Sequence, residues 1–249
     1  MILNKFSPVF FSYRLKSLIL QLLAISLFSC NKSADVNANK AFIGLTHVAY
    51  GVGPLTTTLD GTPLYSGTIS FGHSTGDSLN AYDTATSRIS NMVIQENVIT
   101  LLSGNSAFQQ QGRYSIFVYD SLDKKSIHLI ILQDYPIGHP DTITNIRYMN
   151  FSPGSTIGIY LTNARDTITQ YSPKNFVGYN PNPSLYVFTA VHIGNYGVIA
   201  YEDSINSMHS WKLDSLLIEA GINYNVYVQG FTDSVSDTNK LKLKSVPLN

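Results

Sequence analysis

From residue 41 onward, apolar and polar residues alternate in short runs that turn residues separate. The runs are rich in β-branched and aromatic side chains, which favour strands, and clear examples are RYSIFVYD (113–120), TIGIYL (156–161) and NYNVYVQGF (223–231). Residues 79–94 and 213–221 also fit a helix, but both segments are short. Alternation of this kind is typical of antiparallel sheets with one face in water. The pattern therefore predicts an all-β fold of antiparallel strands.

The pattern also occurs twice. A glycine followed by a Tyr-rich strand, a polar turn and a second strand begins at Gly112 and again at Gly221, an offset of 109. Upstream, the segment from Phe42 parallels the segment from Asn145, an offset of 103. About 100 residues is the usual size of an immunoglobulin-like domain. We therefore expect two tandem immunoglobulin-like antiparallel β-sandwich domains, at 41–134 and 145–249, with a Pro-containing linker at 135–144.

The N-terminus has the layout of a secretory signal. Lys5, Arg14 and Lys16 precede an apolar run, LILQLLAISLFS, at 18–29. These 12 residues are too few for a membrane-spanning helix, which needs roughly 20. A basic region followed by a short apolar region is typical of a signal peptide that is removed. We expect residues 1–29 to be a signal peptide and the polar residues 30–40 to be a flexible tether.

The end of this segment resembles the lipobox of bacterial lipoproteins. LFSC places Leu27 three residues before Cys30 and the small Ser29 directly before it. The resemblance implies that the Cys30 thiol is acylated and that the mature chain begins at this residue. It also implies lipid anchoring in the outer membrane of a Gram-negative cell, facing the periplasm or the surface. The alternatives are an ordinary secretory signal with a chance cysteine and a short buried segment.

Cysteine usage and charge exclude several classes of function. No cysteine follows Cys30, which excludes disulfides and thiolate metal sites from the mature chain. The full chain has 16 basic and 16 acidic residues, and removal of three basic residues with the signal peptide leaves 13 basic against 16 acidic. This mild balance recommends neither nucleic acid nor an anionic surface as a partner.

A turn signature in the second repeat resembles a known family. Asn150, Ser152 and Pro153 form an Asn-x-Ser-Pro turn within IRYMNFSPGSTIGIYLTN. This is similar to the opening of the domain of unknown function 4397 family. LDGTPLYSG (59–67) also fits, whereas VAYGVGP (48–54) departs from the turn. The resemblance covers most of 41–246 as two copies. It implies immunoglobulin-like sandwiches on secreted or lipid-anchored bacterial proteins, without established catalytic residues.

GHSTG, at 72–76, satisfies the G-x-S-x-G pattern of serine hydrolases. That mechanism needs Ser74 on a strained turn between a strand and a helix, with an acid and a histidine downstream. The chain shows no alternation of strands and helices, and DSLNAYDTATS after Gly76 is a poor helix start. We expect a Gly-rich turn between strands and no catalytic residues, with a serine hydrolase as the alternative.

Other ligand chemistry has little support in the sequence. The six histidines show neither H-E-x-x-H nor H-x-H spacing, and DSVSDTN (233–239) lacks the Gly and the distal Glu of an EF-hand loop. We therefore expect no metal and no cofactor. With only three Glu, no carboxylate pair of a glycosidase can be assigned. Trp211 and the abundant Tyr form either a sugar-stacking platform or core and cross-strand pairs.

Asp followed by Ser or Thr and then an apolar residue accounts for eight of the 13 Asp. The pattern resembles the D-(S/T)-apolar acceptor of an O-glycosylation system of some Gram-negative bacteria. The competing interpretation is structural, because Asp-Ser and Asp-Thr form local turns. Under either interpretation we expect exposed turns at the candidate acceptors, which are Ser78, Thr84, Ser121, Thr142, Thr167, Ser204, Ser215 and Ser234.

Together these predictions describe a non-enzymatic, lipid-anchored cell-envelope protein that presents loops from a rigid scaffold. The expected roles are adhesion, scaffolding, or binding of a polysaccharide or of an envelope or surface protein. The membrane would be contacted through the lipid anchor. The alternatives are the serine hydrolase that uses Ser74 and a structural spacer without a ligand.

Overall fold

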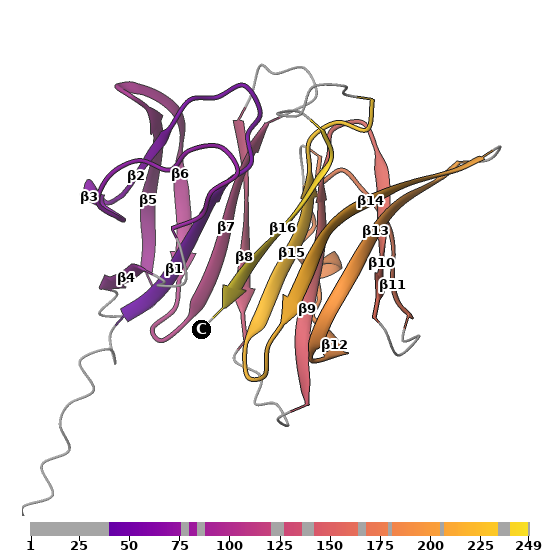
Figure 1. Cartoon of the computed structure of the whole chain (residues 1–249). Helices are drawn as coiled ribbons and strands as arrows, with labels where there is room; N and C mark the ends of the chain where they lie inside the picture. Colours follow the sequence, from indigo (N-terminus) through magenta and orange to yellow (C-terminus); the bar gives the residue numbers. More distant parts are fainter. Residues whose placement is uncertain are drawn as a thin grey trace, which may run out of the picture. The chain divides into compact units, whose positions relative to one another are not determined.

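Strands make up nearly all the regular structure in the computed structural model (Figure 1). The structure describes residues 40–75, 80–83, 88–120, 127–135, 142–163, 168–178, 181–204, 207–233 and 240–248. Within these ranges the only helical element is the 3-10 turn η1 Pro183–Leu185. The predicted all-β fold class is confirmed, and the two segments that also fit a helix contain strands.

The first half of the chain forms two four-stranded sheets. Sheet A has the order β4-β1-β7-β8 and sheet B has the order β3-β2-β5-β6. Alternating hydrophobic residues of both sheets, such as Ile43 and Ile116 of sheet A and Leu55 and Met92 of sheet B, meet between the sheets. The strands are β1 Lys40–His47, β2 Leu55–Leu59, β3 Thr62–Pro63, β4 Asn80–Asp83, β5 Arg88–Glu96, β6 Ile99–Phe108, β7 Arg113–Asp120 and β8 Ile127–Asp134.

The second half repeats this topology strand for strand. Sheet C has the order β12-β9-β15-β16 and sheet D has the order β11-β10-β13-β14, so each strand corresponds to the strand eight places earlier. The strands are β9 Ile143–Phe151, β10 Thr156–Thr162, β11 Ile168–Asn175, β12 Thr189–His192, β13 Gly194–Ser204, β14 Ser207–Ile218, β15 Asn223–Gln229 and β16 Lys242–Leu248. The tandem sandwich architecture predicted from the repeat is therefore present.

The register of the strands defines which residues are equivalent. Ile43 lies opposite Tyr114 in the first half, and Ile146 lies opposite Tyr224 in the second. The predicted offset of 103 between the first strands is thus correct. The offset of the later strands is 110 rather than 109, because the tyrosines and not the glycines are equivalent. Both tyrosine hydroxyls accept a hydrogen bond from the backbone N–H five residues upstream.

One strand pair in each half is parallel, which corrects the expectation of purely antiparallel strands. β1 runs parallel to β7, and β9 runs parallel to β15. A parallel pair cannot be closed by a hairpin, and the chain crosses between the sheets several times before β7 and β15 return beside the first strands. Alternation of apolar residues does not distinguish the two pairings, because both place successive side chains on opposite faces.

The inner strands β7 of sheet A and β9 and β15 of sheet C are buried on both faces, which corrects the expectation of one wet face. The side chains of Ile116 and Val118 point into the first sandwich, whereas Phe117 and Tyr119 enter a third cluster with Phe151 of the second half. Every residue of β15 is buried. The layers thus follow the order B, A, C, D, with a core in each sandwich and a third core between them.

The third core, called here the inter-sandwich face, joins equivalent surfaces of the two halves. Phe117 is equivalent to Tyr227, and their rings contact each other at 5.5 Å. Ser115 is equivalent to Asn225, and the Asn225 amide donates a hydrogen bond to the Ser115 hydroxyl at 2.7 Å. Contact between equivalent residues is the hallmark of a two-fold interface. The two halves therefore pack as a symmetric dimer would, within one chain.

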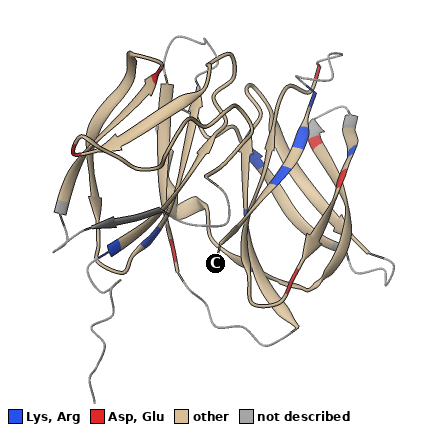
Figure 2. Ribbon diagram, turned by 60° about the vertical axis from the view of Figure 1, so that its left-hand side comes forward, with Lys and Arg blue, Asp and Glu red and all other residues tan. Residues whose placement is uncertain are grey.

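Charged residues are sparse on this framework, as Figure 2 shows. The six lysines in the described ranges are distributed unevenly, and four of them lie between residues 212 and 244.

Candidate functional site

The predicted Asn-x-Ser-Pro turn is held by a buried asparagine. Asn150 lies at 0 % exposure near the end of β9. Its Oδ1 accepts a hydrogen bond from Ser152 N, and its Nδ2 donates to the carbonyls of Ser155 and Lys174. Gly154 completes the turn with a φ of 74°. Asn150 therefore fixes the path of the backbone between the strands.

In the first half, His47 occupies the position of Asn150. Ala49 N donates to His47 Nδ1 at 3.2 Å, so this nitrogen carries no proton. The other nitrogen, Nε2, donates to the Gly53 carbonyl at 3.1 Å. The imidazole thus makes the same two kinds of bond as the asparagine amide. This explains why VAYGVGP departs from the family turn while the chain follows the same course.

Burial lowers the pKa of His47, because the charged imidazolium would lose its hydration. The bonds to the backbone and the charge of Glu96 oppose this effect. Protonation would also place a proton on Nδ1, facing the Ala49 N–H. The folded protein therefore favours the neutral imidazole.

We expect the stability of the protein to fall as the pH drops below 6.5, the ordinary pKa of histidine. The unfolded chain then binds a proton that the folded protein binds only at lower pH, so acid favours unfolding. The free energy of unfolding in urea, measured from pH 7.5 to 5, checks this. His47→Asn keeps both bonds without a titrating group, and its curve should be flatter than that of the wild type. Parallel curves would contradict the assignment.

The described part of the GHSTG segment, Gly72 to Thr75, lies along the edge of β1. Gly72 N donates to the His47 carbonyl and Thr75 N donates to the Leu45 carbonyl, at 2.8 and 2.9 Å. Ser74 forms an antiparallel bridge with Thr46. The next described residues, from Asn80, form a strand. The described context thus differs from the strand-turn-helix of a hydrolase.

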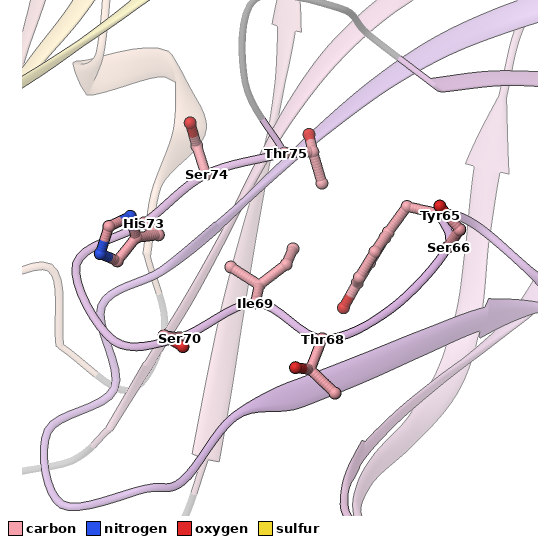
Figure 3. Close-up of a pocket in the computed structure, with 8 residues that line it drawn as sticks. All are labelled: Tyr65, Ser66, Thr68, Ile69, Ser70, His73, Ser74 and Thr75. Carbon is pink, nitrogen blue, oxygen red and sulfur yellow. The ribbon is translucent and has the colours of Figure 1, made fainter.

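Beside this segment lies a polar pocket of about 470 Å³. Figure 3 shows Tyr65 on one side and His73 and Ser74 on the other. The Tyr65 hydroxyl donates to the Leu55 carbonyl at 2.7 Å, which fixes the ring. The remaining lining is rich in hydroxyl groups, contributed by Ser66, Thr68, Ser70 and Thr75.

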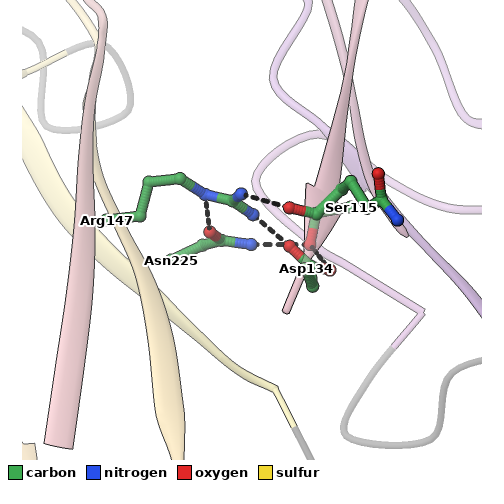
Figure 4. A network of polar contacts seen from close by, with 5 residues as sticks. Ser115, Asp134, Arg147 and Asn225 are labelled. Carbon is green, nitrogen blue, oxygen red and sulfur yellow. Dashed lines mark hydrogen bonds and ion pairs between the residues drawn. The ribbon is translucent and has the colours of Figure 1, made fainter. Parts of the chain in front are cut away.

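A closed polar network crosses the inter-sandwich face (Figure 4). Arg147, 2 % exposed, forms an ion pair with Asp134 and donates through Nε to Asn225 Oδ1 at 2.7 Å. Asn225 donates to Ser115 Oγ, and Ser115 donates to Asp134 Oδ2, both at 2.7 Å. Each half contributes two members, so the network specifies how the sandwiches dock. A fully satisfied buried network of this kind favours a single arrangement.

Burial raises the pKa of the Asp134 carboxyl, and the charge and hydrogen bonds of Arg147 oppose that shift. Burial in turn lowers the pKa of Arg147, which Asp134 opposes. Each charge is therefore costly to bury alone and is tolerated because the other is present.

Next to this network, the two sandwiches enclose a pocket of about 640 Å³, called here the inter-sandwich pocket. One wall comes from β8 and the residue after it, with Gln133 and Tyr135. The opposite wall comes from the segment around η1, with Tyr186 and Phe188. The Arg147 guanidinium lies 4.5 Å from the centre of the Phe188 ring. Charge, aromatic rings and amides therefore meet in one concave site.

The rim of this pocket presents aromatic and planar polar groups together. Tyr135 is 60 % exposed, and its hydroxyl donates to Gln133 Oε1 at 3.1 Å. Gln133 Nε2 approaches Gln109 Oε1 at 3.5 Å. Pockets that combine apolar surfaces with a few placed polar groups are typical small-ligand sites. The sequence pointed to none of these residues as a site, although a charged Arg147 within an apolar strand was a visible signal.

Three of the predicted glycosylation acceptors lie in described residues. Thr142 is exposed in a turn before β9, as expected. Ser204 is the last residue of β13 and pairs with Ser207 across the hairpin. Ser215 is exposed but lies within β14, where Asp214 and Ser215 face Gly197 at a β-bulge, so it is not in a turn. Ser78, Thr84, Ser121, Thr167, Ser234 and the lipid-attachment residue Cys30 lie outside the described residues.

The aromatic and histidine candidates are dispersed. Trp211 packs against the core of the second sandwich, with its ring 6.4 Å from that of His209, and is part of neither pocket described above. His128 and His192 lie in strands, as predicted. In the part of the chain that the structure describes, no three His, Cys, Asp or Glu side chains are grouped to hold a metal ion.

No helix within the described ranges is long and apolar enough to cross a membrane.

Comparison with known proteins finds only distant similarity. No family model and no curated protein matches the chain. Among solved structures, the chain is similar to a proposed cell adhesion protein from Bacteroides ovatus, with 9 % identity, 84 % of this chain and 97 % of that chain covered, and a TM-score of 0.25. The chain is also similar to a proposed cell adhesion protein from Bacteroides eggerthii, with 10 % identity. That comparison covers 86 % of this chain and 97 % of that chain and has a TM-score of 0.23. Values this low carry no argument, and the resemblance to the domain of unknown function 4397 family stays a prediction.

Proposed function

We propose that this chain is a non-enzymatic, lipid-anchored envelope protein that binds a polysaccharide in the inter-sandwich pocket. The observation that carries the proposal is the lining of that pocket. The exposed ring of Tyr135 and the partly buried ring of Phe188 offer flat apolar surfaces to the C–H faces of sugar rings. The amide of Gln133 and the hydroxyl of Ser184 offer hydrogen bonds to sugar hydroxyls.

The size of the pocket supports a short saccharide segment. A volume of about 640 Å³ lies within the range of small-ligand sites and suits a ligand of a few rings. Val187 lines the pocket and is 65 % exposed, and Leu185, two residues before it, is 61 % exposed. These exposed apolar side chains favour the second candidate, a protein partner. The hydrolase that would use Ser74 is not favoured, because the segment forms an edge of β1.

We expect Tyr135→Ala to weaken saccharide binding by about tenfold or more, because one well-placed aromatic contact contributes about 1.4 kcal/mol or more. Isothermal titration of the full chain in detergent against cellohexaose, xylohexaose and maltohexaose measures this. Leu217→Ala, at an equal exposure of 60 %, is the matched control and should bind as the wild type does. Absence of binding to all three, or equal binding by the Tyr135 variant, would contradict the proposal.

Binding of a fluorescent saccharide to fractions of cells tests the lipid anchor. Cells that carry the wild type should retain fluorescent saccharide in the envelope fraction, because the acylated Cys30 would hold the protein there. Cys30→Ala should move saccharide binding from the envelope to the soluble fraction. An unchanged distribution would show that Cys30 is not the anchor. It would not contradict the proposed saccharide site in the inter-sandwich pocket.

A further inference from the structure

Four of the six lysines in the described ranges gather at one edge of the second sandwich. Lys240, Lys242 and Lys244 lie in and just before β16, the edge strand of sheet C. Lys212 lies on β14, the edge strand of sheet D. Figure 2 shows basic residues along this part of the ribbon. The near-neutral charge of the whole chain conceals this local concentration.

The spacing of the three lysines places them on one face of the strand. Side chains two residues apart point the same way and lie about 6.6 Å apart along a strand. Leu241 and Leu243 point the opposite way, into the core of the second sandwich, at 8 % and 7 % exposure. Their burial fixes the orientation of β16, so the lysines form a ladder on its other face.

A groove of about 320 Å³ runs between the two edge strands. Lys212 and Asp214 line it from β14, and Lys240 and Lys242 line it from the other side. Asp214 is the only acidic residue of the lining, so positive charge dominates. Charged edge strands also prevent pairing between sheet edges. Prevention of edge pairing explains lysines on β16, but it requires neither the groove nor the additional Lys212 on β14.

We propose that this lysine groove binds a linear acidic polysaccharide. A row of cations along one strand, with a further cation across the groove, matches a chain that carries repeated negative charges. A membrane surface is flat and would contact only one side of the groove. A single-stranded nucleic acid is bound with aromatic stacking, and the lining contains no aromatic residue. The proposal concerns a different site and ligand charge from the inter-sandwich pocket and does not depend on it.

Heparin is a suitable probe for the full chain in detergent. The variant K240Q/K242Q/K244Q should bind heparin at least about tenfold more weakly at low salt. The slope of its log affinity against log salt concentration should be smaller in magnitude by about two, because fewer lysine contacts release fewer counterions on binding. The charge-retaining K240R/K242R/K244R should bind as the wild type does. Asp214→Asn should bind more tightly, and this gain cannot result from misfolding.

Lys40→Gln removes one charge outside the groove and should leave heparin affinity unchanged. An equal loss in Lys40→Gln and Lys242→Gln would show that only net charge matters and would overturn the site. Wild-type protein that fails to bind heparin at low salt would overturn the ligand class. Lysine-dependent binding to phosphatidylglycerol vesicles, without binding to heparin, would assign the groove to a membrane instead. Thermal unfolding of each variant confirms that the fold is retained.

Discussion

Replacement of Arg147 by methionine is expected to lower the free energy of unfolding by about 3–5 kcal/mol, the usual cost of breaking a buried ion pair from one side. Methionine fills most of the volume but leaves Asp134 buried without its cation. It also removes the hydrogen-bond donor to Asn225. The network across the inter-sandwich face would lose its central member, so the docking of the two sandwiches should weaken together with the overall stability.

Urea denaturation at pH 7 measures this loss, and two comparisons separate its cause from a packing defect. At pH 5 the deficit should be smaller, because without Arg147 the raised pKa of Asp134 lets the folded protein take up a proton and remove the buried charge. The double variant R147M/D134L removes both charges and should be more stable than R147M. A deficit equal at both pH values, or a less stable double variant, would argue against the ion pair.

Replacement of Phe117 by alanine is expected to cost about 3–5 kcal/mol, the range for deleting a large buried aromatic side chain. Phe117 is fully buried on the inter-sandwich face. Its ring stacks on Phe151 at 5.1 Å and meets the edge of Tyr227 at 5.5 Å. Because both partners belong to the other sandwich, the substitution removes contacts between the halves rather than within one core.

Calorimetry shows whether the halves then unfold separately. We expect one transition for the wild type and two, or one broadened transition, for Phe117→Ala. Val98→Ala, at 91 % exposure, is the matched control and should change stability by less than about 0.5 kcal/mol. A single sharp transition for the Phe117 variant, with stability close to the wild type, would contradict the view that this face couples the sandwiches.

The sequence predicted much of the fold because its signals are local. Strands such as β7 and β10 follow from alternating β-branched and aromatic residues, and their ends follow from turn residues. The repeat offset of 103 was correct because the first strands of the two halves have similar patterns. The equivalence of His47 and Asn150 could not be recognised from the sequence. A histidine and an asparagine have no sequence pattern in common, although their side chains make equivalent bonds.

The candidate sites were less accessible to sequence reasoning. Gln133, Tyr135 and Phe188 come from segments about 50 residues apart, and nothing in either segment marks them as neighbours. The lysine ladder of β16 was visible as NKLKLKSV. Its significance depends on Lys212, which lies across the groove only because the edges of sheets C and D meet there.

By itself the sequence determined the strand content, the turns, the two-fold repeat and the absence of cysteine after Cys30. Only the tertiary structure decided which faces of the strands are dry. In RYSIFVYD and IRYMNF, polar residues at alternate positions are what a solvent-facing side would show. Ser115, Arg147 and Asn225 are nevertheless buried, because each also has a polar partner on a strand of the opposite half: Arg147 pairs with Asp134, and Asn225 donates to Ser115. Local alternation records which residues share a face, but the partner of that face is set by contacts more than 100 residues apart in the chain, as between Ser115 and Asn225.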